Sequence, residues 1–121
     1  MPILDIEMVV MRDEIMPSGI AQAIADATAA VFDAPAGTVW TKFRILPITD
    51  YAENGVSGDD VPKPVFVRIL KRELPGPGEL TAEAANLAAA VAKVCGRPVD
   101  NVHILYEPPG AGRVAFGGEL V

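Results

Sequence analysis

The sequence predicts an α+β fold in which two tandem β-α-β units build one four-stranded sheet that carries two helices on a single face. Three observations lead to this prediction. The chain has 121 residues, of which 50% are apolar, a size that suits one compact domain and is too short for two independent ones. Within each half the hydrophobic period changes from two to 3.6 and back, which is typical of a strand, a helix and a second strand. The third observation is an internal repeat.

The repeat divides the chain into halves of about sixty residues each. The segment Val31–Phe43 parallels Val94–Tyr106, with valine, proline and valine in the same register. Pro2–Leu4 and Pro64–Phe66 stand at nearly the same offset upstream. We therefore expect one domain made of two similar units, with bounds of 1–121 for the domain, about 2–60 for the first unit and about 62–121 for the second.

The first half predicts a strand, a helix and a strand. Residues 3–10 are rich in Ile, Leu, Met and Val, while Asp5 and Glu7 alternate onto one face, which is therefore not wholly dry. A helix is expected to begin near Ser18, with the serine as its cap. Its apolar stripe comprises Ile20, Ile24, Ala27 and Val31. The second strand is expected over residues 38–46.

The second half repeats this order. A strand is expected over residues 64–72 and another over 102–106, with a helix between them that Thr81 is expected to cap. The apolar stripe of this helix comprises Ala84, Leu87, Val91 and Val94. Connections rich in Gly, Pro, Asn or Asp are predicted at 51–61, 75–78 and 108–112.

Right-handed crossovers place both helices on one face of the sheet and leave the other face bare. We expect this bare face to be largely apolar, and in a chain this small another subunit is the available cover. The sequence therefore predicts an obligate oligomer, with a homotrimer as the first expectation.

Composition excludes several classes of function. Ten Lys and Arg against sixteen Asp and Glu give a net charge of -6, which argues against nucleic acid as a partner, because such binding depends on clustered cations. No apolar run is long enough for a membrane span. A lone cysteine, Cys95, and an N-terminus without signal-peptide features indicate a reducing, cytoplasmic setting. One histidine and one cysteine are too few for a zinc site, and no glycine-rich nucleotide loop follows a strand, so no metal or cofactor is expected.

The residue with the most distinctive chemistry is Pro2, which directly follows the initiator methionine. Removal of that methionine leaves a secondary amine at the chain end. An α-amino group has a pKa of about 7.7 to 8.0, and burial beside cations lowers it further, because both disfavour the charged form. A neutral prolyl nitrogen can then act as a general base near neutral pH.

Several short patterns, taken in order, resemble the tautomerase superfamily. Pro2-Ile3 opens the first strand, and Arg12 follows ten residues later. The end of the chain, Val102–Glu107 and then Arg113–Leu120 with its Gly-Gly-Glu-Leu ending, is similar to the end of 4-oxalocrotonate tautomerase. The superfamily also includes 5-carboxymethyl-2-hydroxymuconate isomerase and macrophage migration inhibitory factor. The likeness spans essentially the whole chain, as two fused copies of the short unit.

The resemblance implies a trimer in which Pro2 moves a proton between carbon and oxygen of a small α-keto acid or its enol. It also implies substrate-binding side chains, namely Arg72 as the foremost carboxylate anchor, Lys42, Arg12, and His103 at the carbonyl. The implied pocket wall comprises Val114, Phe116 and Trp40. The competing interpretation is that the cations are solvated surface residues, that His103 is structural and that Trp40 belongs to the core.

Departures from the pattern favour isomerisation over related chemistries. The chain turns at Pro75, where the decarboxylase branch has a further arginine, and the turn Ala36–Thr38 lacks that branch's aspartate. The glutamate that the dehalogenase branch has near Phe116 has no clear match. The leading hypothesis is thus a cofactor-independent keto-enol tautomerase. The alternatives are a non-catalytic trimeric ligand- or protein-binding member of the same fold, and a related decarboxylase or hydratase.

Overall fold

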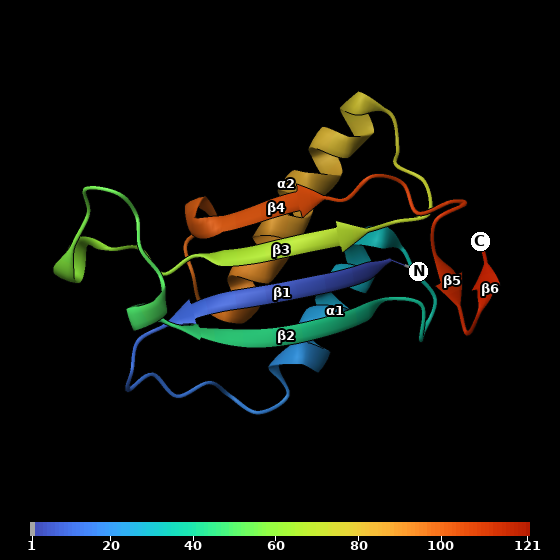
Figure 1. Ribbon diagram of the computed structural model, residues 1–121. Coiled ribbons are helices and arrows are strands. Elements are labelled where there is room, and N and C mark those ends of the chain that lie inside the picture. The colour runs from blue at the N-terminus through green and yellow to red at the C-terminus, as the bar shows by residue number, and fades with distance from the viewer. Residues whose placement is uncertain (1) are drawn as a thin grey trace.

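The computed structural model describes residues Pro2–Val121 and contains one four-stranded sheet, two helices and a short C-terminal hairpin (Figure 1). The strands of the sheet and the helices are β1 (Ile3–Val10), α1 (Ile20–Phe32), β2 (Trp40–Pro47), β3 (Val65–Leu70), α2 (Pro77–Cys95) and β4 (Val102–Tyr106). The hairpin consists of β5 (Ala115–Phe116) and β6 (Glu119–Leu120). Single-turn helices lie at Ile48–Asp50, Gly58–Asp60 and Val99–Asn101.

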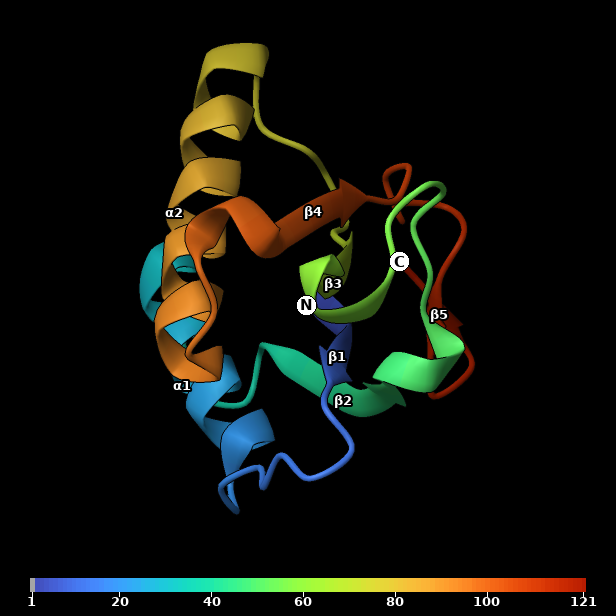
Figure 2. The ribbon, with the colours of Figure 1, turned by 90° about the vertical axis from the view of Figure 1, so that its left-hand side faces the viewer.

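The sheet has the order β2-β1-β3-β4, with β1 and β3 antiparallel at its centre. Each outer strand runs parallel to its inner neighbour. Ile3 pairs with Trp40 in the first half and Val65 pairs with Val102 in the second, and the two partners are equally far apart in sequence in both halves. Both helices cover one face, as Figure 2 shows. The predicted fold class is therefore confirmed.

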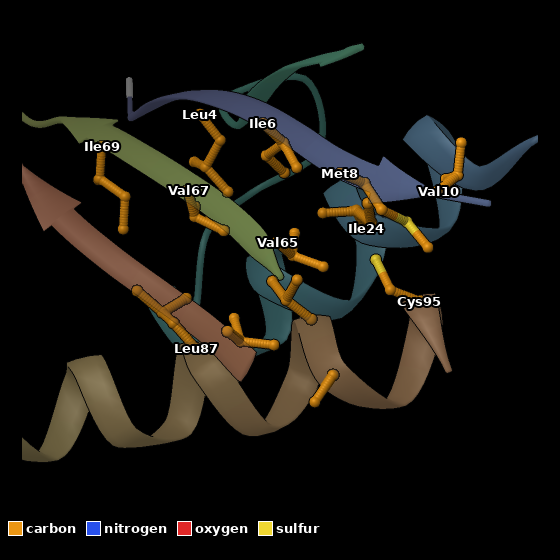
Figure 3. Packing of buried hydrophobic residues seen from close by; sticks show 13 residues of the cluster. Leu4, Ile6, Met8, Val10, Ile24, Val65, Val67, Ile69, Leu87 and Cys95 are labelled. Carbon is orange, nitrogen blue, oxygen red and sulfur yellow. The ribbon is translucent and has the colours of Figure 1, made fainter. Parts of the chain in front are cut away.

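The core lies between the sheet and the two helices (Figure 3). Alternate residues of the two central strands point toward the helices because side chains on a strand alternate between faces. Burial of each large aliphatic side chain contributes roughly 1.5 to 3 kcal/mol. The residues concerned are Leu4, Ile6 and Met8 of β1, Val65, Val67 and Ile69 of β3, Ile24 of α1, and Leu87 and Val91 of α2. Cys95 is also buried there, and burial raises the pKa of its thiol to about 11.

Both helix starts differ from the prediction. Gly19, with φ 80°, precedes α1, and neither Ser18 nor Thr81 caps a helix with its side chain. Helix α2 begins at Pro77, five residues earlier than a cap at Thr81 implies, because proline is well suited to a first turn that needs no N–H. Thr81 lies within that helix, and its hydroxyl donates to the Pro77 carbonyl at 2.9 Å.

Two strands are shorter than predicted. Strand β3 ends at Leu70, which pairs with Ile3, the first residue of β1. The residue before Ile3 is Pro2, whose peptide nitrogen has no hydrogen to donate, so the ladder of hydrogen bonds does not continue. Strand β2 begins at Trp40 because Thr38 belongs to a turn, in which its hydroxyl donates to the Pro35 carbonyl at 2.7 Å. The predicted bounds of β1 and β4 are confirmed.

The uncovered face of the sheet is not largely apolar, and that prediction was wrong. Arg44 donates to Asp5 across β2 and β1 at 2.8 Å, and Arg68 of β3 donates to Glu107 at 2.9 Å. The register sets Asp5 opposite Lys42 and Glu7 opposite Arg44, so Asp5 and Arg44 are diagonal neighbours, and Glu107 directly follows β4. The face therefore carries ion pairs between neighbouring segments. Exposed apolar side chains lie among them, including Trp40, Phe66 and Leu105.

A tightly bonded arginine connects α2 to the far end of β1. Arg97, just after α2, has two hydrogen bonds to the Glu14 carboxylate, at 2.8 and 2.9 Å, and one to the Val9 carbonyl at 3.0 Å. A fourth goes to the Lys63 carbonyl at 3.1 Å. The hydrogen bond from Arg97 lowers the pKa of Glu14.

Within Pro2–Val121, no helix is long and apolar enough to cross a membrane.

Candidate functional site

Pro2 is buried at the start of β1, at the end of the sheet that carries the C-terminal hairpin (Figure 1). Its carbonyl oxygen accepts a hydrogen bond from the Trp40 N–H at 3.0 Å, which fixes Pro2 against the first residue of β2. The sequence pattern that put a strand at Ile3 thus places the proline at a strand end, where its ring does not interrupt the ladder.

A hollow of about 380 Å³ opens on the uncovered face beside this end of β1. Its walls come from β1, β2, β3 and the segment that follows β4. The lining residues are Ile3, Asp5, Lys42, Arg68, Leu70, Glu107, Arg113 and Val114. Lys42 and Val114, both predicted as site residues, therefore lie together in one hollow that Ile3, the residue after Pro2, also lines. Arg68 and Arg113 were not predicted.

Two of the three cations in this hollow have little or no carboxylate contact. Asp5 receives its short hydrogen bond from Arg44, and Lys42 lies 4.0 Å from it. Arg68 is paired with Glu107. Arg113 donates to the Pro109 carbonyl at 3.1 Å and has no ion pair among residues 2–121. Lys42 and Arg113 are therefore available to an anionic ligand, and a guanidinium fits a carboxylate with two parallel hydrogen bonds.

The C-terminal hairpin is held against the sheet by an aromatic contact. The rings of Trp40 and Phe116 meet edge to face, with centroids 5.3 Å apart. The Trp40 indole N–H donates to the Gly37 carbonyl at 3.0 Å, which fixes the ring from its other side. The hairpin closes on itself through the Val121 N–H, which donates to the Val114 carbonyl at 2.9 Å. The two predicted aromatic wall residues thus contact each other beside the hollow and do not line it.

His103 lies in a second hollow on the same face, farther from Pro2. The register pairs it with Phe66, which pairs in turn with Glu7, two residues along β1 from Asp5. The His103 and Phe66 rings are 5.5 Å apart. This hollow, of about 370 Å³, shares Asp5 and Arg68 with the first one. His103 and Pro2 therefore do not meet within one chain.

Arg12 and Arg72 also lie apart from the hollow beside Ile3. Arg12 follows Val10, the last residue of β1. Val10 is about 26 Å from Pro2, because eight strand residues rise roughly 3.3 Å each. Arg12 lines a separate hollow with Met11 and Ile45. Arg72 is exposed two residues beyond the end of β3, and its carbonyl accepts the Ala111 N–H at 3.1 Å.

A polar cluster that the sequence did not reveal lies on the helix side of the same sheet end. The Lys71 ammonium donates to both Glu83 oxygens at 3.0 Å, and the Tyr106 hydroxyl donates to one of them at 3.3 Å. The ammonium also lies 5.0 Å from the centre of the Phe32 ring. Burial, followed by the Glu83 charge, raises the pKa of Tyr106, so the phenol stays neutral. The alternation of β3 was the available signal, since Val65, Val67 and Ile69 face inward and Lys71 continues that series.

No protein-family model and no curated protein sequence matches the chain. Solved structures do match over nearly the full length. A fused 4-OT, described as a symmetric trimer, has a TM-score of 0.74 at 16% identity and covers 98% of this chain and 94% of its own. The macrophage migration inhibitory factor of Trichinella spiralis has a TM-score of 0.71 at 14% identity, with coverages of 98% and 99%. FG41 malonate semialdehyde decarboxylase, inhibited by 3-bromopropiolate, has a TM-score of 0.70 at 18% identity, with coverages of 95% and 88%. At these identities the likeness is one of fold.

Proposed function

We propose that this chain, which has the tautomerase-superfamily fold, is a cofactor-independent keto-enol tautomerase that acts on a small α-keto acid or a related enol. The observation that carries the proposal is that Pro2 is buried directly before Ile3, which lines a hollow in which Lys42 and Arg113 are available to an anion. A base beside cations is what a reaction through an enolate requires, because negative charge develops on the carbonyl oxygen as the proton leaves.

In this mechanism the Pro2 nitrogen, freed by removal of Met1, is the general base. It takes a proton from one position of the enol or keto acid and returns it to the other, so that no cofactor or water is consumed. Arg113 and Lys42 hold the substrate carboxylate, as a fork and a point charge respectively. Val114, with the Trp40–Phe116 pair behind it, keeps the amine away from bulk water, which favours its neutral form.

The other predicted substrate-binding residues belong, in this proposal, to a site that more than one copy of the chain completes. Fused 4-OT structures are described as symmetric and asymmetric trimers, and we propose a homotrimer here too. Arg12 and His103 lie too far from Pro2 to act in the same chain, so we assign them to the site of a neighbouring copy. Arg72, the foremost carboxylate anchor that the resemblance implies, stays a proposed anchor, although it does not line the hollow beside Ile3. The single buried cysteine supports a reducing, cytoplasmic setting.

The test is a Pro2→Ala variant assayed for enol ketonisation, with an unaltered oligomer as the control. We expect a loss of about 10²- to 10⁴-fold in turnover, the range typical of a general base. Unchanged turnover would rule out Pro2 as the base. The intact mass of the mature chain provides a second check, because a retained Met1 keeps the nitrogen in an amide that has no basicity.

Two alternatives have different signatures in the same assay. A non-catalytic binding protein of this fold would bind α-keto acids with Lys42 and Arg113 but would not ketonise an enol. A decarboxylase would release carbon dioxide from a semialdehyde acid. We include this alternative because malonate semialdehyde decarboxylase has a similar fold. Assays with an enol and with such an acid distinguish the three.

A further inference from the structure

The ion pair between Lys71 and Glu83 is sheltered in the monomer. The two side chains are 19% and 14% exposed, less than the 54% and 29% of Arg44 and Asp5 on the open face. Charges in such a place are screened weakly by solvent and salt, so they act on their neighbours more strongly than surface charges do. The pair therefore influences any titratable group that lies beside it.

The strand register, continued by one residue, brings Pro2 toward this pair. The last printed pair is Ile3 with Leu70, and both residues line the hollow on the open face. Pro2 and Lys71 are the next residues outward, and the alternation that turns Leu4 and Ile69 toward the helices predicts that both lie on the helix side. The contacts of Lys71 with Glu83 of α2 and with the Phe32 ring of α1 confirm that its side chain points to that side.

We propose that Lys71 and Glu83 together set the proton affinity of the Pro2 nitrogen, with Lys71 favouring the neutral amine and Glu83 restraining that effect. This inference rests on the proposed function, because it requires Pro2 to begin the mature chain. It makes Lys71 and Glu83 tuning residues that act through Pro2 and do not contact the substrate. Their opposite charges predict opposite consequences when each is removed.

Among the other polar groups at this end of the sheet, the Thr41 hydroxyl, which pairs in register with Leu4, is uncharged and buried without a hydrogen-bond partner. Arg72 and Glu119 are exposed, so solvent screens their charges. Tyr106 is neutral and donates its hydroxyl proton to Glu83. On the open face Asp5 and Glu107 are bonded to Arg44 and Arg68. Lys42 and Arg113, the remaining cations of the hollow, favour a neutral amine in the same direction as Lys71. They stay unchanged in the experiment, so their contribution is constant.

The experiment is a pH titration of the amino-terminal nitrogen by NMR, on the full chain labelled with ¹⁵N-proline, after mass spectrometry has shown that Pro2 is first. In Glu83→Gln the ammonium acts without its counter-charge, and the midpoint falls. In Lys71→Met the carboxylate acts alone, and the midpoint rises. We expect shifts of roughly half a pH unit or more in each direction, since a charge within about 4–6 Å moves a pKa by one unit or more before screening.

Additional variants control for misfolding and for the effect of remote charges. Lys71→Met combined with Glu83→Gln leaves no buried charge unpaired, so it folds if either single variant fails, and its midpoint returns toward that of the wild type. Lys71→Arg keeps the charge and the wild-type midpoint. Glu79→Gln and Lys93→Met remove exposed charges from the same helix, and screening keeps their midpoints unchanged.

The outcomes separate this inference from the proposed function. Shifts in the same direction, or none, overturn the inference even where the enzyme is active and Pro2 is essential. Opposite shifts in a protein that fails to ketonise any enol support the inference and overturn the function. A retained Met1 overturns both. In an active enzyme, the acid limb of the kcat/KM profile moves with the NMR midpoint.

Discussion

At the end of the sheet where β1 finishes, Arg97 has four hydrogen bonds, two of them to Glu14, and its side chain is only 9% exposed. At the end where β1 begins, Lys42 has a single carboxylate 4.0 Å away and Arg113 donates only to backbone carbonyls. At the first end Arg97 holds α2, β1 and the segment before β3 together, while the exposed Arg12 has no ion pair among residues 2–121. The second end leaves cations available, and it is also the end at which Pro2 lies. The proposed ligand site is therefore at the end where Lys42 and Arg113 are not committed to the fold.

The largest effect on stability is expected when Arg97 is replaced. We expect Arg97→Met to lower the free energy of unfolding by about 3 kcal/mol, because removing one partner of a sheltered ion pair leaves the other unpaired. Two backbone carbonyls lose their donor as well. Urea denaturation measures the change, and Lys93→Met, an exposed cation two residues before the end of α2, provides the matched control at about 0.5 kcal/mol or less. Equal midpoints would contradict the structural role.

The pH dependence of stability tests the contribution of Glu14, the partner of Arg97 at the same end of the sheet. The pKa of Glu14 is lower in the folded chain than the ordinary value of 4.5, chiefly through the hydrogen bond from Arg97. Because the pKa of Glu14 is lower in the folded chain, its carboxylate stabilises the fold at pH values above its pKa in the unfolded chain. That stability is lost as the pH falls through its pKa in the folded chain. Glu14→Gln is therefore expected to be less stable than the wild type by about 1 to 2 kcal/mol at pH 7.

The difference in stability between Glu14→Gln and the wild type should narrow as the pH falls below the ordinary carboxyl pKa of 4.5 and then through the lower pKa of folded Glu14, because the wild-type carboxyl becomes protonated too. Thermal unfolding of both proteins across that range measures it. A constant difference at every pH would show that the charge of Glu14 contributes nothing.

The smallest effect on stability is expected at the other end. Arg113→Met should change the free energy of unfolding by about 0.5 kcal/mol or less, because the side chain is exposed and pairs with no carboxylate among residues 2–121. It should weaken the binding of an α-keto acid by about tenfold, which corresponds to about 1.4 kcal/mol. Calorimetric titration of the variant measures the affinity. A large loss of stability with unchanged affinity would reverse the comparison between the two ends.

Much of the fold could be predicted because the central strands alternate clearly. The bounds of Ile3–Val10 and of Val102–Tyr106 follow from period-two patterns that end at turn residues. The helix starts were missed because backbone conformation at Gly19 and proline chemistry at Pro77 define them, and neither depends on a side-chain cap. The charge pairs of the open face were missed because they depend on register between strands, which a single strand does not reveal.

The candidate site was predicted less completely for the same reason. The alternation of β2 placed Lys42 on the open face, and Val114 lies in the hollow beside Ile3. Arg113 reaches that hollow only because the segment after β4 turns back over β3, where the Gly110 N–H donates to the Lys71 carbonyl at 2.8 Å. No local pattern encodes that return.

The last residue of the chain is bonded into the hairpin through the Val121 N–H, beside the hollow next to Pro2. This has a practical consequence for anyone who labels the protein. A tag added after Val121 would extend from the mouth of the candidate site, and a tag before Pro2 would convert its nitrogen to an amide. The exposed tip at Gly55–Gly58 lies at the opposite end of the sheet (Figure 1), and a fluorophore or affinity handle inserted there leaves Pro2 and Val121 unaltered.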